Sequence, residues 1–373
     1  MQSAIALTQD LVRFNTINPP GAERACAEHL AGLLEPVGFA VELIPFGERR
    51  AQLVARIGGA DDRSPLGFTG HLDTVPLGAQ PWSVDPFAAE IADGKLYGRG
   101  SSDMKSGVAA FVAACMALAD RLKGTPGVLL VITAGEETGC SGAAELAKEK
   151  ARLGKVGAFV VAEPTGNRPL VGHKGALWLE AETVGVTAHG SMPEKGVNAI
   201  YKAARAVTAL QVFDFNVARH EKLGAPTLNV GTIQGGLNIN SVPDRALIGI
   251  DIRTIPAQTH AQIRAQLASY LGPEVTLRTL MDAQSIWSDP QGSWMREVFE
   301  VAQAVAGVGD QIAAAPYFTD ASELTPTLGN PPTVILGPGE LALAHQTDEY
   351  CLVSRIEEAT ELYAQLVLRW CGI

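Results

Sequence analysis

Two adjacent glutamates, Glu136 and Glu137, stand in the segment AGEETG, directly after the apolar run GVLLVIT. That run is β-branched and typical of a buried strand, so the two carboxylates are expected where the strand ends. Side-by-side carboxylates repel each other, and burial raises the cost of ionising either one. The sequence therefore predicts that a positive charge lies close to this pair.

Other residues that could bind a metal follow further expected strand ends. His71 and Asp73 stand in GHLDTVP at i, i+2 spacing, which points both side chains the same way on an extended chain. Asp103 precedes an expected helix in GRGSSDMKSG, Glu163 stands in VVAEPTG, and His345 stands in GPGELALAHQTDEY. In open α/β sheets, ligand sites lie at the carboxyl ends of the strands, so we expect these segments to converge.

The predicted cluster would hold five carboxylates and two imidazoles. Two unit charges in contact interact with about 4 kcal/mol at an intermediate dielectric, so the acids need compensation. One divalent ion would leave several carboxylates uncompensated, whereas two would nearly balance the set. Imidazole and carboxylate ligands without thiolate suit zinc, and also cobalt or manganese. We therefore predict two divalent metal ions, with one of the adjacent glutamates as a ligand and the other as a base.

Each of these residues has an ordinary alternative when it is taken alone. A histidine near a strand end is usually a hydrogen-bonded loop residue, and an aspartate before a helix, such as Asp103, is usually an N-cap. A Glu-Glu pair after a strand is most often a solvated turn. The metal prediction depends on the joint pattern, because five separate segments each present a ligand-type residue.

The elements that must position these residues alternate in the first third of the chain. Apolar residues recur at helical spacing from Cys26 to Val37 and from Val108 to Leu122, while GVLLVITA and GAFVVAE are typical of buried strands. We therefore predict an α/β catalytic domain over residues 1–174 and 285–373, with a mixed, largely parallel sheet sandwiched by helices. Residues 175–284 combine half-exposed strand patterns with two helical segments, which predicts an inserted α+β domain.

Composition narrows the class of protein. The chain has 373 residues, which suits two domains, and its 47% hydrophobic and 18% charged content is that of a globular protein. A formal net charge of −11 argues against nucleic acid or an anionic membrane as a partner. The apolar runs are predicted to be too short to span a bilayer. Five widely spaced cysteines and no basic, apolar leader predict free thiols and a cytoplasmic protein.

Six motifs in order resemble the M20 family of di-zinc metallohydrolases over essentially the whole chain. They are GHLDTVP, LYGRGSSDMKSG, AGEETGCSGA, VAEPTG, AHGSMPEKGVNAI and GPGELALAHQTDEY. The resemblance implies that Asp103 bridges two metal ions. It also implies that His71 and Glu163 complete one metal site, and that Glu137 and His345 complete the other.

The resemblance further assigns roles around the metals. Asp73 would hydrogen-bond the imidazole of His71, and Glu136 would be the general base. Residues 175–284 would form a ferredoxin-like lid and dimerisation domain of a homodimer. His189, in TAHGSMP, would reach the active site of the partner subunit and stabilise the oxyanion.

Four residues are candidates for substrate binding on the same resemblance. Arg253 would hold a substrate carboxylate, and Asn240 would lie near the scissile carbonyl; their alternatives are a strand ion pair and a turn former. Gly337 and Gly339 would let the backbone approach the substrate closely. Lys174, at the expected domain junction, is interpreted as structural, with substrate contact as the alternative.

Within the family, the motifs look closest to the acetylornithine deacetylase and desuccinylase branch. This implies cleavage of a small N-acyl group from an amino acid. A metallo-carboxypeptidase or dipeptidase and a specialised catabolic amidase are the alternatives. The segment YFTDASEL (317–324) departs from the desuccinylase pattern, which weakens a diaminopimelate substrate.

Two other classes of function are disfavoured. GRGSSD begins like a dinucleotide-binding G-x-G-x-x-G, but Asp103 occupies its sixth position and the motif does not open a βαβ unit. A metal-binding scaffold without activity needs no second glutamate beside a ligand, so the retention of both Glu136 and Glu137 favours an enzyme.

Overall fold

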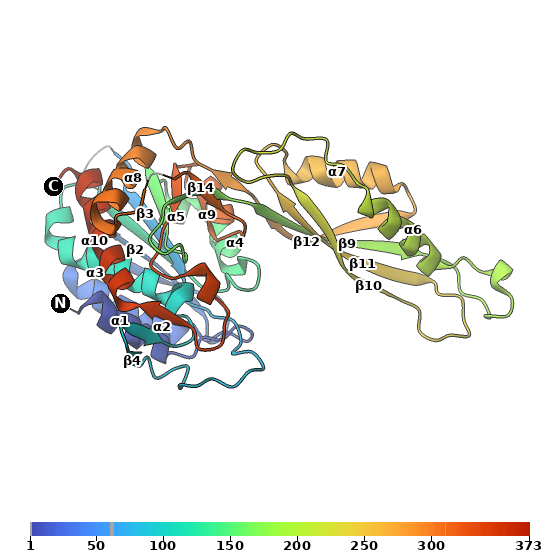
Figure 1. Cartoon of the computed structure of the whole chain (residues 1–373), viewed down its shortest axis with the longest axis horizontal. Coiled ribbons are helices and arrows are strands. Elements are labelled where there is room, and N and C mark those ends of the chain that lie inside the picture. Colours follow the sequence, from blue (N-terminus) through green and yellow to red (C-terminus); the bar gives the residue numbers. More distant parts are fainter. Residues whose placement is uncertain (1, 60–62, 310) are drawn as a thin grey trace. The chain divides into compact units, whose positions relative to one another are not determined.

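The computed structural model describes residues 2–59, 63–309 and 311–373, and the chain divides into two compact units (Figure 1). Unit 1 comprises Met1–Gly172, Trp287–Ala313 and Thr319–Ile373, and unit 2 comprises His173–Ile286 and Ala314–Phe318. The main boundaries fall next to the predicted limits of 174/175 and 284/285. Residues 314–318 differ from the prediction, because they belong to unit 2 and not to the catalytic domain. Lys174 N–H donates to Ala315 C=O, which ties this short segment to the start of unit 2.

A nine-stranded sheet organises unit 1, in the order β1-β2-β6-β3-β7-β15-β8-β13 with β14 paired to β8. Its strands are β1 (Ala40–Pro45), β2 (Ala51–Ile57), β3 (Leu66–His71), β6 (Val128–Thr133), β7 (Ala158–Val161), β8 (Leu170–His173), β13 (Ile286–Trp287), β14 (Ala313–Ala315) and β15 (Thr333–Ile335). The central strands β6, β3, β7 and β15 pair in parallel, whereas β1, β2 and β8 pair antiparallel. The predicted mixed, largely parallel sheet is confirmed.

The four parallel strands are buried along their whole length, as expected of strands covered on both faces of the sheet. Parallel strands end at one edge, so the residues that follow β3, β6 and β7 are brought together there.

Helices pack on this sheet and on one another. They are α1 (Ala4–Arg13), α2 (Arg24–Leu34), α3 (Ser106–Leu122), α4 (Ser141–Ala147), α5 (Lys150–Leu153), α8 (Ser293–Ala306), α9 (Ala321–Thr327) and α10 (Val353–Cys371), with the short turns η1 (Glu35–Val37), η2 (Ser101–Lys105) and η4 (Leu341–Leu343). A small antiparallel sheet of β4 (Ile91–Ala92), β5 (Lys95–Tyr97) and β16 (Tyr350–Leu352) joins distant parts of the chain in the order β16-β5-β4.

The central helix α3 packs against α1, α10 and β3 and is buried along most of its length. With η2 it forms a run of 22 residues, Ser101–Leu122, that is long and apolar enough to cross a membrane. The prediction that all apolar runs are too short is therefore wrong on length. However, 83% of the most apolar part of this run is buried inside the unit, as in the core helix of a globular domain.

Unit 2 is a four-stranded antiparallel sheet, β10-β11-β9-β12, with helices packed against it. Its elements are β9 (Gly175–Val184), β10 (Thr227–Gly235), β11 (Arg245–Thr254), β12 (Val275–Ala283), α6 (Ala199–Gln211), α7 (His260–Leu271) and the turn η3 (Pro193–Lys195). Leu177 and Leu179 alternate with Trp178 along β9 and lie in the core with residues of α6 and α7, whereas Trp178 is 38% exposed. This alternation is the predicted half-exposed pattern.

All five cysteines are buried and none forms a disulfide.

Candidate active site

Five chain segments bring the predicted ligands together within unit 1. The side chains come from the ends of β3, β6 and β7, from η2 and from the loop between η4 and β16: His71, Glu136, Glu137, Glu163, Asp103 and His345. Each strand end contributes because its apolar run stops there and the chain turns polar.

The ligand-type atoms form two groups of three that share Asp103. One group is His71, Asp103 and Glu163, and the other is Asp103, Glu137 and His345; within each, the candidate atoms lie within 4.8 Å of one another. The two oxygens of Asp103 face different imidazoles, with Oδ1 3.2 Å from His71 Nε2 and Oδ2 3.3 Å from His345 Nε2. Glu163 Oε1 lies 3.9 Å from His71 Nε2, and Glu137 Oε2 lies 3.2 Å from His345 Nε2.

Burial makes these acids costly to ionise. It raises the pKa values of Glu136 and Glu163 well above the ordinary carboxyl value, despite the opposing field of His71, and the neighbouring carboxylates add to the shift. Burial also raises the pKa of Glu137, and the nearby Asp103 adds to it. Hydrogen bonds to Asp103 and Glu137 raise the pKa of His345 to about 10. Ionising all of these acids at once therefore needs positive charge beyond what the chain supplies.

The residues fit a pair of divalent cations. Glu137 Oε1 is buried and has no hydrogen-bond partner among the described residues, as expected of an oxygen that binds a cation. Donor atoms around a tetrahedral zinc ion are about 3.4 Å apart for bonds of about 2.0–2.2 Å. The observed separations of 3.2 to 3.9 Å between the imidazole nitrogens and the carboxylate oxygens match this spacing.

Asp73 holds a loop and not primarily an imidazole. Its Oδ1 accepts the backbone N–H groups of Gly135 and Glu136 at 2.8 and 3.1 Å, and its Oδ2 accepts that of Glu137 at 3.2 Å. His71 Nδ1 lies 2.9 Å from the backbone carbonyl of Asp73 and 3.7 Å from its carboxylate. The geometry differs from the expected carboxylate–imidazole bond, because the turn after β6 presents three N–H groups to the carboxylate.

Asn18 completes the environment of Asp73, and sequence reasoning did not identify it. Its Nδ2 donates to Asp73 Oδ2 at 2.8 Å and to Thr138 Oγ1 at 3.1 Å. Asn18 lies in the segment NTINPP, in which only the polar residue before two prolines signals a special role.

Glu136 belongs to neither ligand group. It lies in a third buried cluster with Cys140 and Asp320, in which Cys140 Sγ is 3.7 Å from Glu136 Oε1. Asp320 is buried at the start of α9, accepts a hydrogen bond from Thr133 Oγ1, and has its pKa raised to about 6 by burial. Asp320 stands in the YFTDASEL segment that departs from the desuccinylase pattern, and no motif signals its position beside Glu136.

Gly337 and Gly339 approach protein backbone closely. A Cβ atom on Gly337 would lie 2.2 Å from the carbonyl oxygen of Ala162, and one on Gly339 would lie 2.1 Å from that of Ser102. No side chain fits at either position without moving the segments that carry Glu163 and Asp103. In this structure the two glycines therefore fix the spacing of the candidate ligands. The sequence prediction gave another reason for glycine at these positions, namely close approach of the backbone to the substrate.

The remaining predicted residues lie in unit 2. His189 is exposed, and its Nδ1 accepts the Ser191 N–H at 3.2 Å and lies 2.7 Å from Ser191 Oγ. The neutral ring therefore carries its proton on Nε2. Asn240 is exposed in the loop after β10, where its backbone carbonyl accepts the backbone N–H of Gly190 at 2.7 Å.

Arg253 and Lys174 also lie in unit 2. Arg253 Nε is 3.0 Å from Asp251 Oδ1, and its guanidinium lies 5.8 Å from the ring centre of Phe318. This ion pair is the structural role that was the alternative to substrate binding for Arg253. The side chain of Arg253 also stays partly exposed. Lys174 Nζ donates to the Ala225 carbonyl at 2.8 Å.

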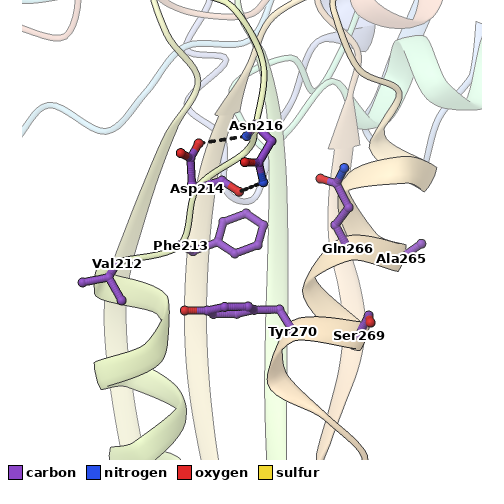
Figure 2. Close-up of a pocket in the computed structure, with 8 residues that line it drawn as sticks. All are labelled: Val212, Phe213, Asp214, Asn216, Ala265, Gln266, Ser269 and Tyr270. Atoms are coloured by element: carbon purple, nitrogen blue, oxygen red, sulfur yellow. Dashed lines mark hydrogen bonds between the residues drawn. The ribbon is translucent and has the colours of Figure 1, made fainter.

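A pocket of about 650 Å³ lies on unit 2 between the end of α6 and α7 (Figure 2). The rings of Phe213 and Tyr270 meet there at 5.2 Å, and Asn216 donates to Asp214 through its backbone N–H at 2.8 Å. None of the predicted site residues lines it, so the chemistry is assigned to the cluster in unit 1.

Comparison with known proteins identifies the class. Residues 67–369 match the peptidase family M20/M25/M40. The chain belongs to this family, whose members are metallohydrolases acting on amide bonds.

Two curated relatives are similar to nearly the whole chain. Acetylornithine deacetylase of Proteus mirabilis (strain HI4320) is 32% identical over 356 residues, which cover 92% of this chain and 89% of the relative. A probable succinyl-diaminopimelate desuccinylase of Staphylococcus aureus (strain Mu50) is 30% identical over 397 residues, covering 96% and 97%. Among solved structures, an M20 family metallo-carboxypeptidase from Sulfolobus solfataricus aligns over 100% of both chains with a TM-score of 0.79 at 18% identity. This last likeness supports the fold alone.

Proposed function

We propose that this metallohydrolase removes a small acyl group from an N-acyl amino acid, in the manner of an acetylornithine deacetylase. The observation that carries the proposal is the pair of three-residue ligand groups sharing Asp103, with the buried Glu136 beside them but in neither. The identities of 32% and 30% to two deacylases, each over more than nine tenths of this chain, support the acyl-group assignment.

Zinc is the proposed metal, with cobalt and manganese as alternatives. His71, Asp103 and Glu163 would hold one ion, and Asp103, Glu137 and His345 the other. When bound, the ions polarise the amide carbonyl and lower the pKa of water to about 7. The same charges would return the buried carboxyl groups to their ionised forms.

Glu136 moves the proton in the proposed reaction. Its carboxylate takes a proton from the attacking water, whose oxygen bonds to the amide carbon. The C–N bond then breaks, and Glu136 passes the proton to the leaving nitrogen, so that an amine and a carboxylic acid are released, and the acid loses its remaining proton to solvent. Asp73 keeps Glu136 in place, because its Oδ1 accepts the backbone N–H of Glu136.

Three residues of unit 2 are proposed to act on the substrate. His189 would donate a hydrogen bond from Nε2 to the developing oxyanion. Nε2 carries the proton of the neutral ring because Nδ1 is occupied by its contacts with Ser191. Arg253, held by Asp251 and Phe318, would bind the carboxylate of the amino acid. Asn240 would orient the scissile carbonyl.

We further propose a homodimer formed through unit 2. Strand β10 is an edge strand of the four-stranded sheet and carries Ile233, which is 50% exposed. Tyr201 on α6 is 66% exposed, and Leu237 and Ile239 in the loop after β10 are fully exposed. An unpaired strand edge beside exposed apolar side chains is a ready surface for pairing with another chain. The cytoplasmic location is proposed because all five cysteines are buried thiols.

A carboxypeptidase or dipeptidase activity is the second candidate. It is favoured by the matched family, which is described as a family of peptidases. Both activities would use the same metal centre and Glu136, and they differ in the group on the acyl side of the scissile bond.

A substrate panel tests the proposal. N-acetyl, N-succinyl and N-formyl amino acids and dipeptides are assayed for amine release with zinc, cobalt or manganese, and Glu136→Gln at equal metal content is the matched control. We expect the highest kcat/KM for an N-acyl amino acid. A higher kcat/KM for dipeptides would establish the second candidate, and no hydrolysis by the metal-loaded protein would refute both.

A further inference from the structure

A fully buried ion pair lies behind the candidate metal centre in unit 1. Arg99 is 1% exposed and Glu349 is fully buried, and Arg99 Nη1 lies 2.6 Å from Glu349 Oε2. Arg99 stands four residues before Asp103, and Glu349 stands four residues after His345. The pair therefore joins the segment of the shared ligand Asp103 to the segment of His345.

Glu349 binds the segment of Asp103 through backbone N–H groups. Its Oε1 accepts those of Ser102 and Asp103 at 2.8 and 3.0 Å. Its Oε2 accepts that of Gly100 at 3.1 Å, together with the Arg99 guanidinium. Both oxygens of one carboxylate are thus used to shape the turn that presents Asp103.

The main chain beside Glu349 is fixed in the same region. Its carbonyl accepts the Gly98 N–H at 2.9 Å, and the carbonyl of Tyr350 accepts Ser102 Oγ–H at 3.0 Å. Strand β16 begins at the next residue, Tyr350, and pairs with β5, so the chain enters a sheet directly after Glu349. His345 itself is 52% exposed and has a positive φ of 63°, so its own packing holds it weakly.

We propose that Glu349, supported by Arg99, is a positioning residue for the metal centre. It sets the spacing between Asp103 and His345 at which both candidate groups can hold a divalent ion. Any effect of Glu349 on catalysis rests on the proposed metal-dependent hydrolysis. Its effect on metal affinity does not, because metal affinity is measured without substrate.

The substitution Glu349→Gln tests the spacing. An amide has one acceptor oxygen, so its NH₂ group would face either Arg99 and Gly100 or the N–H groups of Ser102 and Asp103. We expect at least one of the two zinc ions to bind about 10–100-fold more weakly in chelator competition, which is the usual effect of losing the partner of a metal ligand. The cobalt-loaded variant should also show a changed visible absorption spectrum.

Val298→Ala is the matched control for loss of stability. Val298 is a fully buried core residue of α8 and has no part in the metal cluster. It should lower the melting temperature while leaving zinc affinity and the cobalt spectrum unchanged. If Glu349→Gln fails to fold, Arg99→Lys is measured in its place, because it keeps the charge but not the guanidinium geometry, and it should weaken zinc binding in the same direction.

Two results would overturn the proposal. In the first, the position-349 or position-99 variant melts earlier but keeps wild-type affinity for both zinc ions and the wild-type cobalt spectrum, so that the ion pair is structural only. In the second, Val298→Ala weakens zinc binding as much as Glu349→Gln, so that global stability explains the loss. Failure of the wild-type protein to hydrolyse the substrate panel would refute the proposed function and leave these binding measurements intact.

Discussion

Asp73→Asn should destabilise the metal-free protein strongly, because Asp73 accepts four hydrogen bonds in a buried site. They come from the backbone N–H groups of Gly135, Glu136 and Glu137 and from Asn18 Nδ2. An asparagine at this position keeps one acceptor oxygen, so two donors would face its NH₂ group whichever way the amide is turned. A hydrogen bond to a charged group contributes about 1.5–3 kcal/mol, so losing two costs about 3–6 kcal/mol in the free energy of unfolding.

The assay is urea unfolding of the metal-free protein, followed by circular dichroism, with wild type and variant compared at one pH. Metal-free protein is used because bound metal adds its own binding free energy to the native state. Adding Asn18→Asp to the variant should restore part of the loss, because the carboxylate introduced there would accept from the new NH₂ group. If Asp73→Asn unfolds within about 1 kcal/mol of wild type but loses activity, the carboxylate acts mainly on His71 and the loop-holding account is wrong.

The site leads to three further predictions. Glu136→Gln should lower kcat by at least about 10²–10⁴-fold, because it removes the proton acceptor, while zinc affinity in chelator competition stays at the wild-type value; near-normal turnover would remove Glu136 as the base. In metal-free protein, the pKa of His345 is raised to about 10, so protonated His345 stabilises the fold fully below its unfolded pKa of about 6.5, and this contribution is lost as the pH rises to 10. The free energy of unfolding should therefore fall between pH 6.5 and 10 in wild type and fall less in His345→Asn. Equal slopes in the two proteins would contradict the pairing of His345 with Asp103 and Glu137. His189→Ala should lower kcat about 10²–10³-fold if it is a single oxyanion donor, and mixing it with Asp103→Ala should recover activity in heterodimers; no recovery would argue against a site shared between subunits.

The cluster of candidate metal ligands could be predicted from sequence because its parts are local. His71 ends a predicted buried strand, and Glu137 and Glu163 follow two others; the parallel pairing of β3, β6 and β7 brings these ends to one edge. The chain order of the motifs then indicated the M20 family, which the family match confirms. Roles set by residue type and strand position could be predicted in this way.

Roles set by long-range backbone contacts could not be predicted. Asp73 and the turn at Gly135 are 62 residues apart, and Glu349 and Ser102 are 247 residues apart. A carboxylate that accepts backbone N–H groups needs no particular residue on the other side, so no motif records the partnership. The same holds for Gly339, whose lack of a side chain matters only because the carbonyl of Ser102 lies where a Cβ atom would be.

The burial of α3 has a consequence for synthesis of the protein. This helix is covered by α10 (Val353–Cys371), which is translated long after it. While residues 123–352 are being translated, the apolar helix α3 lacks the cover of α10. Nascent chains must therefore be kept from associating through α3 until α10 has been made, which makes the docking of α10 a late step in folding of this unit.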